Sequence, residues 1–598
     1  MSKLIETEVL IVGSGPAGAA SAALLSSYGI SNIMLNRRGW LADTPRAHIS
    51  NQRTMEVLRD LGLEAEAMSV ASANHQMANC VFCYSLAGEE FGRLLAWGNH
   101  PTRRAEYELS SPTEMCDIPQ TYLEPILFKA AAARGTSVLM NTLFTGLEQD
   151  GDGVTATVRD RLSGETRQIR AKYLIGADGA RSDVANAIGL PMEGKTGLSA
   201  STNVIFEADL SKYVEHRPSV LYWVLQPGSN VGGIGASVLR MVRPWHEWQS
   251  IWGVDLDKVE TNITHEEAEA TLRELIGDPD IPIRVKSTAV WTVNNMYARE
   301  YSVGRVFCMG DAVHRHPPLN GLGSNTSIQD AFNLCWKLAL VLKGQAGPAL
   351  LETYSTERQP VGKQIVTRAN KSAEDYPPLF DAIGLLGSDD PKVVRDQIEA
   401  RKAATPEGKA RRQRLHQAVR QKNYEFNTHG VEIGQRYRDS AAIVTEGQAE
   451  PAYDRDPELY YHPTTWPGAR LPHVWLERDG KRVSTLDLCG QGGFTLLTGI
   501  GGDAWHDAAR AAAQKYGVSL TCLSIGPSGS DAMDILGDWY HLSEIDEDGA
   551  ILVRPDHHIA WRANSLLPDA GARLDAVMGQ VLGLAVPVQK AAEVREDA

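Results

Sequence analysis

A glycine-rich stretch near the start of the chain constrains the fold more than any other feature. It reads VGSGPAG, from Val12 to Gly18, between an apolar strand-like run and a helix of small residues expected over about 16–26. Gly13 would make a tight turn, Gly15 would let a phosphate approach the backbone, and Gly18 would let helix and strand pack closely. The helix N-terminus would offer unpaired N–H groups to an anion. We therefore predict a Rossmann-like dinucleotide site at Gly13, Gly15, Ala17 and Gly18.

The residue that usually binds the ribose departs from the common pattern. About twenty residues after the glycines, at the end of the expected second strand, the acidic residue is replaced by Asn36. An amide can accept a bond from a ribose hydroxyl, but it carries no charge to repel a 2′-phosphate. The contact is expected, and it is less diagnostic than a carboxylate would be.

Two further glycine-containing stretches lie far along the chain. IGADGARSDV spans Ile175 to Val184, and GDAVHRHPPLNGLGSN spans Gly310 to Asn325. The second of these follows a strand expected at 305–309 and precedes a helix expected at 327–342. Together the three stretches predict a pocket for FAD, and therefore an oxidoreductase.

Composition and charge exclude several other classes of protein. A chain of 598 residues is too long to form a single hydrophobic core, so several domains are expected. Its content of 43% hydrophobic and 22% charged residues is ordinary for globular domains. A net charge of −15 argues against a nucleic-acid partner. No signal peptide or membrane span is expected, and seven thinly spread cysteines favour the cytoplasm over a disulfide framework. Cys80 and Cys83 have CxxC spacing without a second pair, so no metal site is predicted.

Changes in residue pattern and composition along the chain predict several domains. Alternating strand and helix patterns indicate an FAD-binding domain over 1–200, in which 76–107 contribute to a substrate domain. A Val-, Trp- and Tyr-rich region predicts an inserted antiparallel sheet over 201–300 that would bind substrate. The FAD-binding domain would resume at 301–345, and the remaining segments are a helical region at 346–440, a linker at 441–466 and a small α/β domain at 467–598.

The three motifs, in this order and spacing, resemble the single-component FAD-dependent aromatic hydroxylases, the family of 4-hydroxybenzoate and phenol hydroxylases. PRAHISNQRTMEVLRDLGLEAE and GRVFCMGDAVHRHPPLNGLGSNTSIQDAFNLCWKLALVL are most similar to the branch of 2,4-dichlorophenol 6-monooxygenase. The resemblance implies an α/β protein with a Rossmann-like FAD-binding domain, an inserted antiparallel-sheet substrate domain and a C-terminal thioredoxin-like domain. That last domain has no CxxC, and Cys489 stands alone, so we expect subunit association there rather than redox chemistry.

The resemblance also implies roles for particular residues. Asp311 would contact the ribityl chain of FAD, and backbone N–H groups of Gly323, Ser324 and Asn325 would approach the flavin carbonyl. Asp178, in the second motif, would serve both FAD and a transient NADPH or NADH. Arg46 and Gln120 match positions on the flavin side. Because no second dinucleotide fingerprint is present, NAD(P)H is expected to bind in passing to a flavin that moves outward.

Two residues are candidates for the chemistry on the substrate. A phenol reacts faster as phenolate, so a general base is useful. His48 stands where relatives carry a catalytic aspartate, and it would be the base or would hydrogen-bond the substrate or flavin. Tyr297 would reach the substrate hydroxyl or close the edge of the core. His314 and His316 have metal-like spacing but lie inside the flavin motif, where they would shape the loop.

Three functions follow as hypotheses. The first is NAD(P)H- and O2-dependent hydroxylation of a small aromatic substrate, a phenol, ortho to its hydroxyl, with chlorophenol to chlorocatechol as the specific candidate. The second is hydroxylation of a bulkier biosynthetic phenol or polyketide, and the third is a flavin-binding sensor without turnover. A flavin halogenase is disfavoured because the WxWxIP signature is absent. A homodimer or homotetramer is expected.

Overall fold

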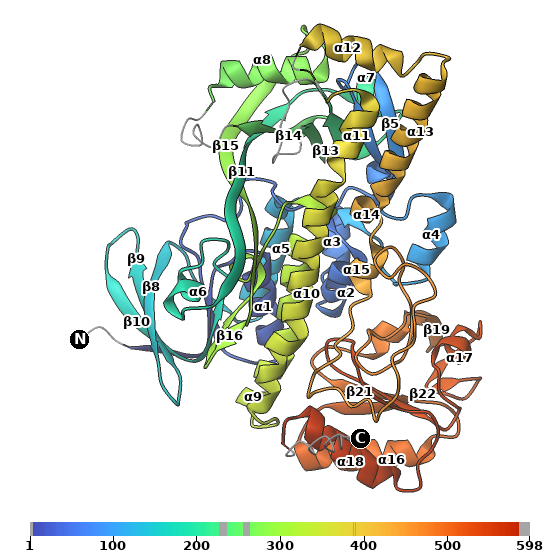
Figure 1. Cartoon of the computed structure of the whole chain (residues 1–598). Helices are drawn as coiled ribbons and strands as arrows, with labels where there is room; N and C mark the ends of the chain where they lie inside the picture. The colour runs from blue at the N-terminus through green and yellow to red at the C-terminus, as the bar shows by residue number, and fades with distance from the viewer. Residues whose placement is uncertain (1–3, 227–235, 255–262, 387, 389, 585–598) are drawn as a thin grey trace, which may run out of the picture. The chain divides into compact units, whose positions relative to one another are not determined.

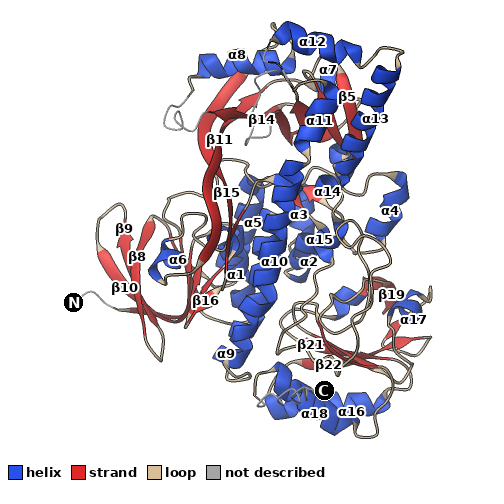
Figure 2. Cartoon of the chain, viewed as in Figure 1, coloured by secondary structure: helices blue, strands red, loops and turns tan. Residues whose placement is uncertain are grey.

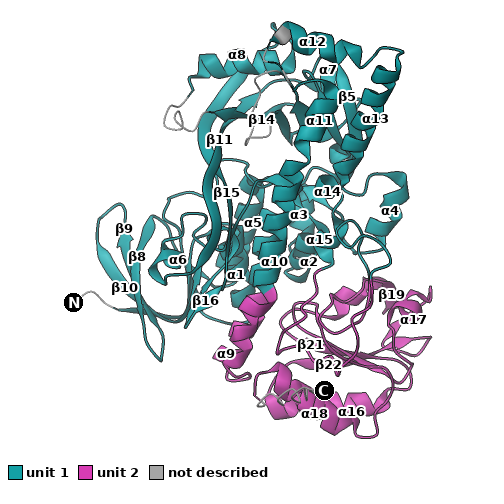
Figure 3. Ribbon diagram, viewed as in Figure 1, with its two compact units in different colours: residues 1–332, 358–434, 453–462 teal, residues 333–357, 435–452, 463–598 magenta. Residues whose placement is uncertain are grey.

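The computed structural model describes residues 4–226, 236–254, 263–386, 388 and 390–584 (Figure 1). Parts of the predicted substrate sheet (201–300) and of the predicted C-terminal domain (467–598) lie outside these ranges. The chain forms two compact units (Figure 3). Unit 1 comprises Met1–Phe332, Arg358–Gly434 and Tyr453–His462, and unit 2 comprises Asn333–Glu357, Gln435–Ala452 and Pro463–Ala598.

The first sheet of unit 1 is built around a buried parallel core. Its main path runs β16-β17-β10-β1-β2-β7, and β1 pairs in parallel with both β2 and β10. Val9 to Val12 are buried on both faces, as expected for a central parallel strand. The strands are β1 (Ile5–Val12), β2 (Asn32–Leu35), β7 (Ser137–Leu139), β8 (Thr142–Gln149), β9 (Val154–Asp160), β10 (Thr166–Gly176), β16 (Ser302–Val303) and β17 (Val306–Cys308).

Two helices, α1 (Pro16–Ser27) and α5 (Gln120–Ala133), pack together beside this sheet. α1 agrees with the helix expected at about 16–26. The Ala, Gly and Ser side chains of α1 are mostly buried, because small residues let it lie close to the strands.

The second sheet of unit 1 is mostly antiparallel. Its order is β18-β15-β11-β14-β13-β12-β4-β5, with β12 and β4 as a parallel pair. The strands β11 and β15, of 16 and 15 residues, pair with each other and form a long two-stranded antiparallel ribbon (Figure 2). The strands are β4 (Asn79–Cys83), β5 (Glu90–Leu95), β11 (Met192–Glu207), β12 (Ser219–Val224), β13 (Ser237–Arg243), β14 (Glu247–Val254), β15 (Arg284–Ala298) and β18 (His314–Arg315).

Short elements and helices complete unit 1. A two-stranded sheet pairs β3 (Ile49–Ser50) with β6 (Cys116–Asp117). α9 (Gly323–Leu342) and α10 (Ala349–Glu374) each run through the division of the chain into units. The other helices are α2 (Gln52–Asp60), α3 (Glu64–Val70), α4 (Pro101–Glu108), α6 (Asp183–Ala187), α7 (Ser211–Val214), α8 (His265–Ile276), α11 (Tyr376–Ile383), α12 (Pro391–Ala400), α13 (Pro406–Gln421), α14 (Asn423–Phe426) and α15 (His429–Ile433), with 3-10 turns η1 (Asn74–Met77), η3 (Gly310–Ala312) and η4 (Leu319–Gly321).

Unit 2 has its own mixed sheet, ordered β20-β19-β23-β22-β21-β24-β25. β21 and β22 are parallel, and β24 and β25 form an antiparallel pair. Figure 2 shows α16 and α18 on one side of this sheet. The elements are β19 (Trp475–Arg478), β20 (Lys481–Ser484), η5 (Thr485–Leu488), β21 (Phe494–Thr498), α16 (Asp503–Tyr516), β22 (Leu520–Gly526), β23 (Ala532–Met533), α17 (Asp538–Leu542), β24 (Ala550–Val553), β25 (Ile559–Ala563) and α18 (Ala570–Val581).

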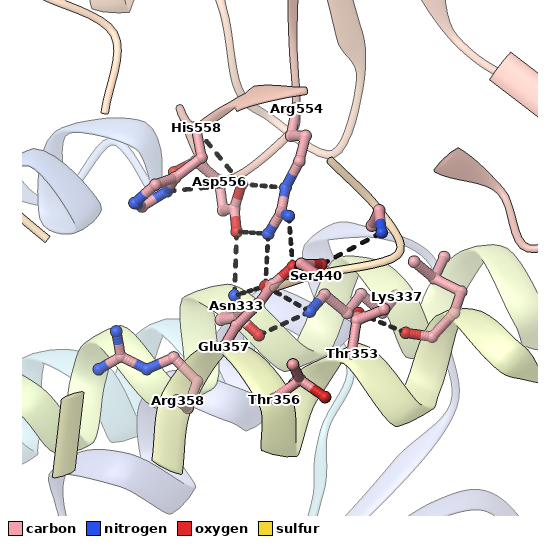
Figure 4. A network of polar contacts seen from close by, with 12 residues as sticks. Asn333, Lys337, Thr353, Thr356, Glu357, Arg358, Ser440, Arg554, Asp556 and His558 are labelled. Carbon is pink, nitrogen blue, oxygen red and sulfur yellow. Dashed lines mark hydrogen bonds and ion pairs between the residues drawn. The ribbon is translucent and has the colours of Figure 1, made fainter. Parts of the chain in front are cut away.

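A buried charge network lies within unit 2 (Figure 4). The carboxylate of Glu357 accepts bonds from Nη1 and Nη2 of Arg554 at 2.6 and 2.8 Å, and from Nζ of Lys337 at 2.7 Å. Asp556 Oδ2 accepts a second bond from Arg554 Nη2 at 2.6 Å. Burial opposes ionisation of Glu357, but Arg554 and Lys337 hold its pKa well below the usual range. Two anions therefore balance two cations out of contact with water.

The seven cysteines all lie in the described part of the chain, and none of them is recorded in a disulfide bond. Six are buried, and Cys522 is partly exposed. Burial raises the pKa of Cys83 and of Cys522 to about 12, so these thiols stay protonated at neutral pH. In the described residues, no helix combines the length and apolarity needed to cross a membrane.

Candidate active site

The glycines of the first motif are required for two different reasons. Gly13 has φ +107°, and a Cβ there would overlap the carbonyl oxygen of Ala177. A Cβ on Gly18 would overlap the carbonyl oxygen of Gly13. At Gly15, by contrast, the nearest protein atom to a Cβ would be Glu124 Oε1, at 3.8 Å. Gly13 and Gly18 are therefore fixed by the protein's own packing, whereas the space over Gly15 fits the close approach of a pyrophosphate.

The start of α1 also fits an anion. Gly15 is the N-cap and supplies no side-chain hydrogen bond, and Pro16 begins the helix. The first-turn N–H groups, including that of Ala17, are thus not capped by the residue before them. A helix N-terminus of this kind binds phosphate through its N–H groups and its dipole.

Asn36 uses its amide within its own loop. Its Nδ2 donates to the carbonyl of Trp40 at 3.0 Å, and its Oδ1 accepts from the N–H of Arg38 at 2.8 Å. The expected ribose contact therefore depends on the remaining lone pair of Oδ1. In this structure the residue stabilises the turn that follows β2.

Gln120 and Arg46 lie near a carboxylate that the sequence did not indicate. Gln120 Nε2 donates to Glu124 Oε1 at 2.5 Å, and Glu124 Oε2 accepts from the N–H of Ala42 at 2.7 Å. Burial raises the pKa of Glu124, although the guanidinium of Arg46 lowers it. Arg46 itself is exposed. The i,i+4 spacing of Gln120 and Glu124 on α5 was the one available signal.

The second motif packs directly on the first. The N–H of Ala177 bonds to the carbonyl of Val12 at 2.8 Å, which places the motif beside Gly13. Asp178 Oδ1 accepts from Ser182 Oγ at 2.5 Å, and its Oδ2 accepts from the N–H of Val184 at 3.1 Å. Burial raises the pKa of Asp178. Its contact with FAD or NAD(P)H stays a prediction.

The third motif rests on a buried ion network. Asp311 is exposed, and the N–H of the preceding Gly310 donates to Asp330 Oδ2 at 3.1 Å. Asp330 also contacts His314 Nε2 at 3.0 Å and accepts from Arg358 Nε at 2.8 Å. Burial opposes its ionisation, but Arg358 and His314 lower the pKa of Asp330 below its usual value. His314 thus shapes the loop under Asp311, as expected, and the supporting Asp330 and Arg358 were not predicted.

Asn325 connects the start of α9 to the segment that follows His48. Its Oδ1 accepts from the N–H of Asn51 at 3.0 Å and from Thr54 Oγ1 at 2.6 Å. Its Nδ2 donates to the carbonyl of Ile49 at 2.8 Å and to that of Gly321 at 2.6 Å. The amide group of Asn325 thus makes all four of these hydrogen bonds within the protein. The backbone contacts expected of Gly323, Ser324 and Asn325 with the flavin remain a prediction.

His48 is paired with a buried carboxylate. Its Nδ1 lies 2.6 Å from Oδ2 of Asp117, and the two side chains are 14% and 1% exposed. The N–H of Ile118 donates to the carbonyl of His48 at 2.7 Å, beside the β3–β6 pairing, which fixes the two backbones relative to each other. Burial and then Arg240 lower the pKa of His48, against an opposite effect of Asp117. Burial and Arg240 together therefore favour the neutral form of the imidazole.

Arg240 supports the loop that carries both Arg46 and His48. It projects from β13, is 2% exposed, and donates through Nη1 to the carbonyls of Pro45 and Arg46 and to Gln249 Oε1. Burial lowers its pKa to about 10, and Asp117 acts in the opposite direction. Among the described residues, Arg240 Nε and Nη2 and Asp117 Oδ1 have no hydrogen-bond partner.

Tyr297 lies on β15 with a partner of its own. Its hydroxyl donates to Glu193 Oε2 at 2.5 Å, and its ring packs against the buried cluster of Leu322, Ile365 and Val366. A hydroxyl bonded to Glu193 would have to turn away from it to reach a substrate. The role of Tyr297 toward substrate remains a prediction. The described residues contain no group of three or more His, Cys, Asp or Glu side chains suited to hold a metal ion.

Comparison with known families agrees with this arrangement. A family model described as an FAD binding domain matches residues 6–369, and a model described as aromatic-ring hydroxylase, C-terminal, matches residues 464–585. The chain therefore belongs to the FAD-dependent aromatic-ring hydroxylases, and FAD is its cofactor.

Individual relatives match along nearly the whole chain. The 2,4-dichlorophenol 6-monooxygenase of Delftia acidovorans is 55% identical, covering 97% of this chain and 99% of the relative. The enzyme of the same name from Cupriavidus pinatubonensis is 54% identical, covering 98% and 97%. The phenol 2-monooxygenase of a Pseudomonas species is 48% identical, covering 99% and 95%.

Solved structures share the fold over the same length. The flavin-dependent monooxygenase PieE, in complex with FAD and substrate, is 46% identical with a TM-score of 0.93, covering 97% of this chain and 100% of PieE. Aklavinone-11 hydroxylase, in complex with FAD and aklavinone, is 29% identical with a TM-score of 0.79, covering 97% and 99%. The mixed α/β structure with several sheets is thus that of a flavin-dependent monooxygenase.

Proposed function

We propose that the protein hydroxylates a phenol ortho to its hydroxyl group, using NAD(P)H and O2, with conversion of a chlorophenol to a chlorocatechol as the leading reaction. The observation that carries the proposal is the 55% and 54% identity, over 97% and 98% of the chain, to two 2,4-dichlorophenol 6-monooxygenases. The phenol 2-monooxygenase at 48% identity supports the same substrate class.

The residues of the three motifs would hold the cofactor. Bound FAD, reduced by NAD(P)H, supplies the activation of O2 for transfer of one oxygen atom to the ring. Gly15 and the N-terminus of α1 would accept the pyrophosphate, and Asp311 would contact the ribityl chain. The other proposed contacts are Gly13, Ala17, Gly18, Arg46, Gln120, Asp178, Gly323, Ser324 and Asn325.

His48 would act on the substrate. A neutral imidazole can take the proton of the phenol hydroxyl, which makes the ring more electron-rich at its ortho carbon. Its Nδ1 is occupied by Asp117, so Nε2 is the nitrogen left to accept that proton. Tyr297 would contact the substrate hydroxyl only after leaving Glu193.

The first experiment is substrate-stimulated NAD(P)H oxidation by the purified FAD-loaded protein. We expect small phenols and chlorophenols to accelerate NAD(P)H oxidation and O2 uptake, with catechols as products. If only bulky polyketide phenols stimulate NAD(P)H oxidation, the protein is instead a hydroxylase of a biosynthetic phenol or polyketide. FAD that stays bound while no phenol changes NAD(P)H oxidation would instead favour a sensor.

Substitution of His48 tests its role as base. His48→Ala is expected to keep FAD bound and to lower kcat by about 10²- to 10⁴-fold, the usual contribution of a positioned base. In the wild type, kcat/KM should fall as pH drops through the lowered pKa of His48, because a protonated imidazole cannot accept the phenol proton. His246→Ala, at a ring 69% exposed, is the matched control and should leave turnover unchanged. Wild-type turnover in His48→Ala at every pH would remove His48 from the mechanism.

The finer organisation is also part of the proposal. We place an FAD-binding domain at 1–200 and 301–345, a substrate domain at 201–300 and a thioredoxin-like domain at 467–598, in a homodimer or homotetramer. Cysteines without disulfides support a reducing compartment, the cytoplasm. Light scattering of the purified protein measures the oligomeric state.

A further inference from the structure

We propose that the base is a His48–Asp117 dyad, in which Asp117 holds the proton of His48 on Nδ1 and Arg240 balances the charge of Asp117. The proposal rests on the proposed function and deepens it. Asp117 is a positioning residue, because it acts on the substrate through His48. The proton-transfer step breaks the phenol O–H bond and forms an N–H bond at His48 Nε2, leaving a phenolate and an imidazolium.

Geometry is the first argument for the dyad. The 2.6 Å contact between His48 Nδ1 and Asp117 Oδ2 is as short as a charge-assisted hydrogen bond. An ionised carboxylate only accepts hydrogen bonds, so the Nδ1 position must carry the hydrogen and Nε2 must present its lone pair. The backbone bond from Ile118 to His48, next to the β3–β6 pairing, keeps the two side chains in register. The same carboxylate–imidazole arrangement orients general bases in other enzymes.

Charge is the second argument. Asp117 is 1% exposed, and a carboxylate so far from water needs compensation. Arg240, also buried, interacts electrostatically with Asp117 and with His48. With His48 neutral, Asp117 and Arg240 sum to zero. After proton transfer the imidazolium and the phenolate add charges of opposite sign, so the total stays zero throughout the step.

The unsatisfied atoms support the same assignment. Asp117 Oδ1 and Arg240 Nε and Nη2 are buried without a partner among the described residues, although such groups are normally hydrogen-bonded. Buried polar atoms without a protein partner usually form hydrogen bonds to a bound molecule or to water. The charged groups that act on His48 are Asp117 from β6 and Arg240 from β13, and they shift its proton affinity in opposite directions.

Asp117→Asn is the decisive variant, because the amide keeps the shape and can donate to Nδ1, which favours the wrong imidazole tautomer. We expect kcat to fall about 100-fold or more with a phenol that is protonated in solution. With a highly chlorinated phenol that is already ionised at the assay pH, the loss should be less than about tenfold, because no proton has to be removed. Asp117→Glu should restore part of the activity. An equal loss with both substrates, or no loss with either, would overturn the dyad.

A binding measurement separates this inference from the proposed function. 4-Nitrophenol, added to the oxidised FAD-loaded protein, should show the difference spectrum of nitrophenolate in the wild type at a pH below the pKa of the free phenol. In Asp117→Asn it should bind as the neutral phenol. The readout requires no turnover. If the wild type binds nitrophenolate but no phenol stimulates NAD(P)H oxidation, the hydroxylase assignment fails; if both proteins bind the same form, the dyad fails.

Substitutions of Arg240 and of Asp117 should shift the pH dependence of kcat/KM in opposite directions. Arg240→Gln removes a positive charge that lowers the pKa of His48, so the acid limb of the kcat/KM profile should move to higher pH. Asp117→Asn removes the group that raises that pKa, so in its residual activity the limb should move to lower pH. FAD content and thermal unfolding of both variants report whether the fold is intact. Shifts in the same direction would contradict the arrangement.

Discussion

Replacing Glu357 by alanine will lower the stability of unit 2 by about 3–5 kcal/mol, the usual cost of breaking a buried ion pair. Its carboxylate accepts bonds from Arg554, Lys337, Asn333 and Ser440, and all of these are buried. Alanine would leave Arg554 with Asp556 alone and Lys337 without an anion. Burial already lowers the pKa of Lys337 to about 8, so this amine would lose its proton more readily once Glu357 is gone.

The measurement is hydrogen exchange of peptides from β24 and β25, because a chain with two units need not unfold in one step. Glu352→Ala is the matched control: Glu352 is exposed on the same helix, α10, and its replacement should cost less than about 1 kcal/mol. Glu357→Gln keeps the side-chain volume and removes the charge. Its loss of stability should lie between those of Glu357→Ala and Glu352→Ala. A loss below about 1 kcal/mol in Glu357→Ala would show that the network contributes little to stability.

Gly15→Ala is expected to separate cofactor binding from folding. The nearest protein atom to the new methyl group would be 3.8 Å away, so the apoprotein should be as stable as the wild type. The methyl group would occupy the space that a pyrophosphate needs, so the Kd for FAD should rise tenfold or more, which is about 1.4 kcal/mol. Titration of FAD by the quenching of its fluorescence measures this directly.

Gly13→Ala should fail in a different way. The added Cβ would overlap the carbonyl oxygen of Ala177, in a backbone conformation at φ +107° that suits glycine. Both the stability of the apoprotein and FAD affinity should fall together. Gly151→Ala, where a Cβ meets nothing within 4 Å and φ is not in the left-handed region, is the control for both. Unchanged FAD affinity in Gly15→Ala would move the pyrophosphate away from this turn.

The sequence predicted the local backbone of the candidate site where its residues lie in one continuous stretch. The spacing of Gly13, Gly15 and Gly18 specifies a turn and a helix start, and α1 begins at Pro16 as expected. His314, expected to shape the loop of the third motif, contacts the buried Asp330 there. Such patterns are local, because the residues that cooperate are a few positions apart and their geometry follows from one secondary-structure element.

The residues that we propose as partners of His48 could not be found in this way. Asp117 lies 69 positions from His48 and reaches it through a two-residue strand that leaves no periodic pattern. Arg240 is one basic residue in a strand, and its position under the loop of Pro45 and Arg46 depends on how the second sheet packs. The segment 346–440 was expected to be helical, but a helical pattern does not show that a charged side chain such as that of Arg358 is buried. These contacts depend on tertiary packing rather than on local propensity.

The distribution of the cysteines gives the protein a set of built-in reporters. Cys80, Cys83, Cys116 and Cys308 are buried in unit 1, and Cys335, Cys489 and Cys522 belong to unit 2. A thiol-specific alkylating reagent should reach the partly exposed Cys522 first, although its raised pKa makes this reaction slow at neutral pH. The reagent should modify a buried thiol only when the surrounding structure opens. Mass spectrometry after pulsed alkylation would then show, without any engineered label, which unit opens first as the protein is heated or as FAD is removed.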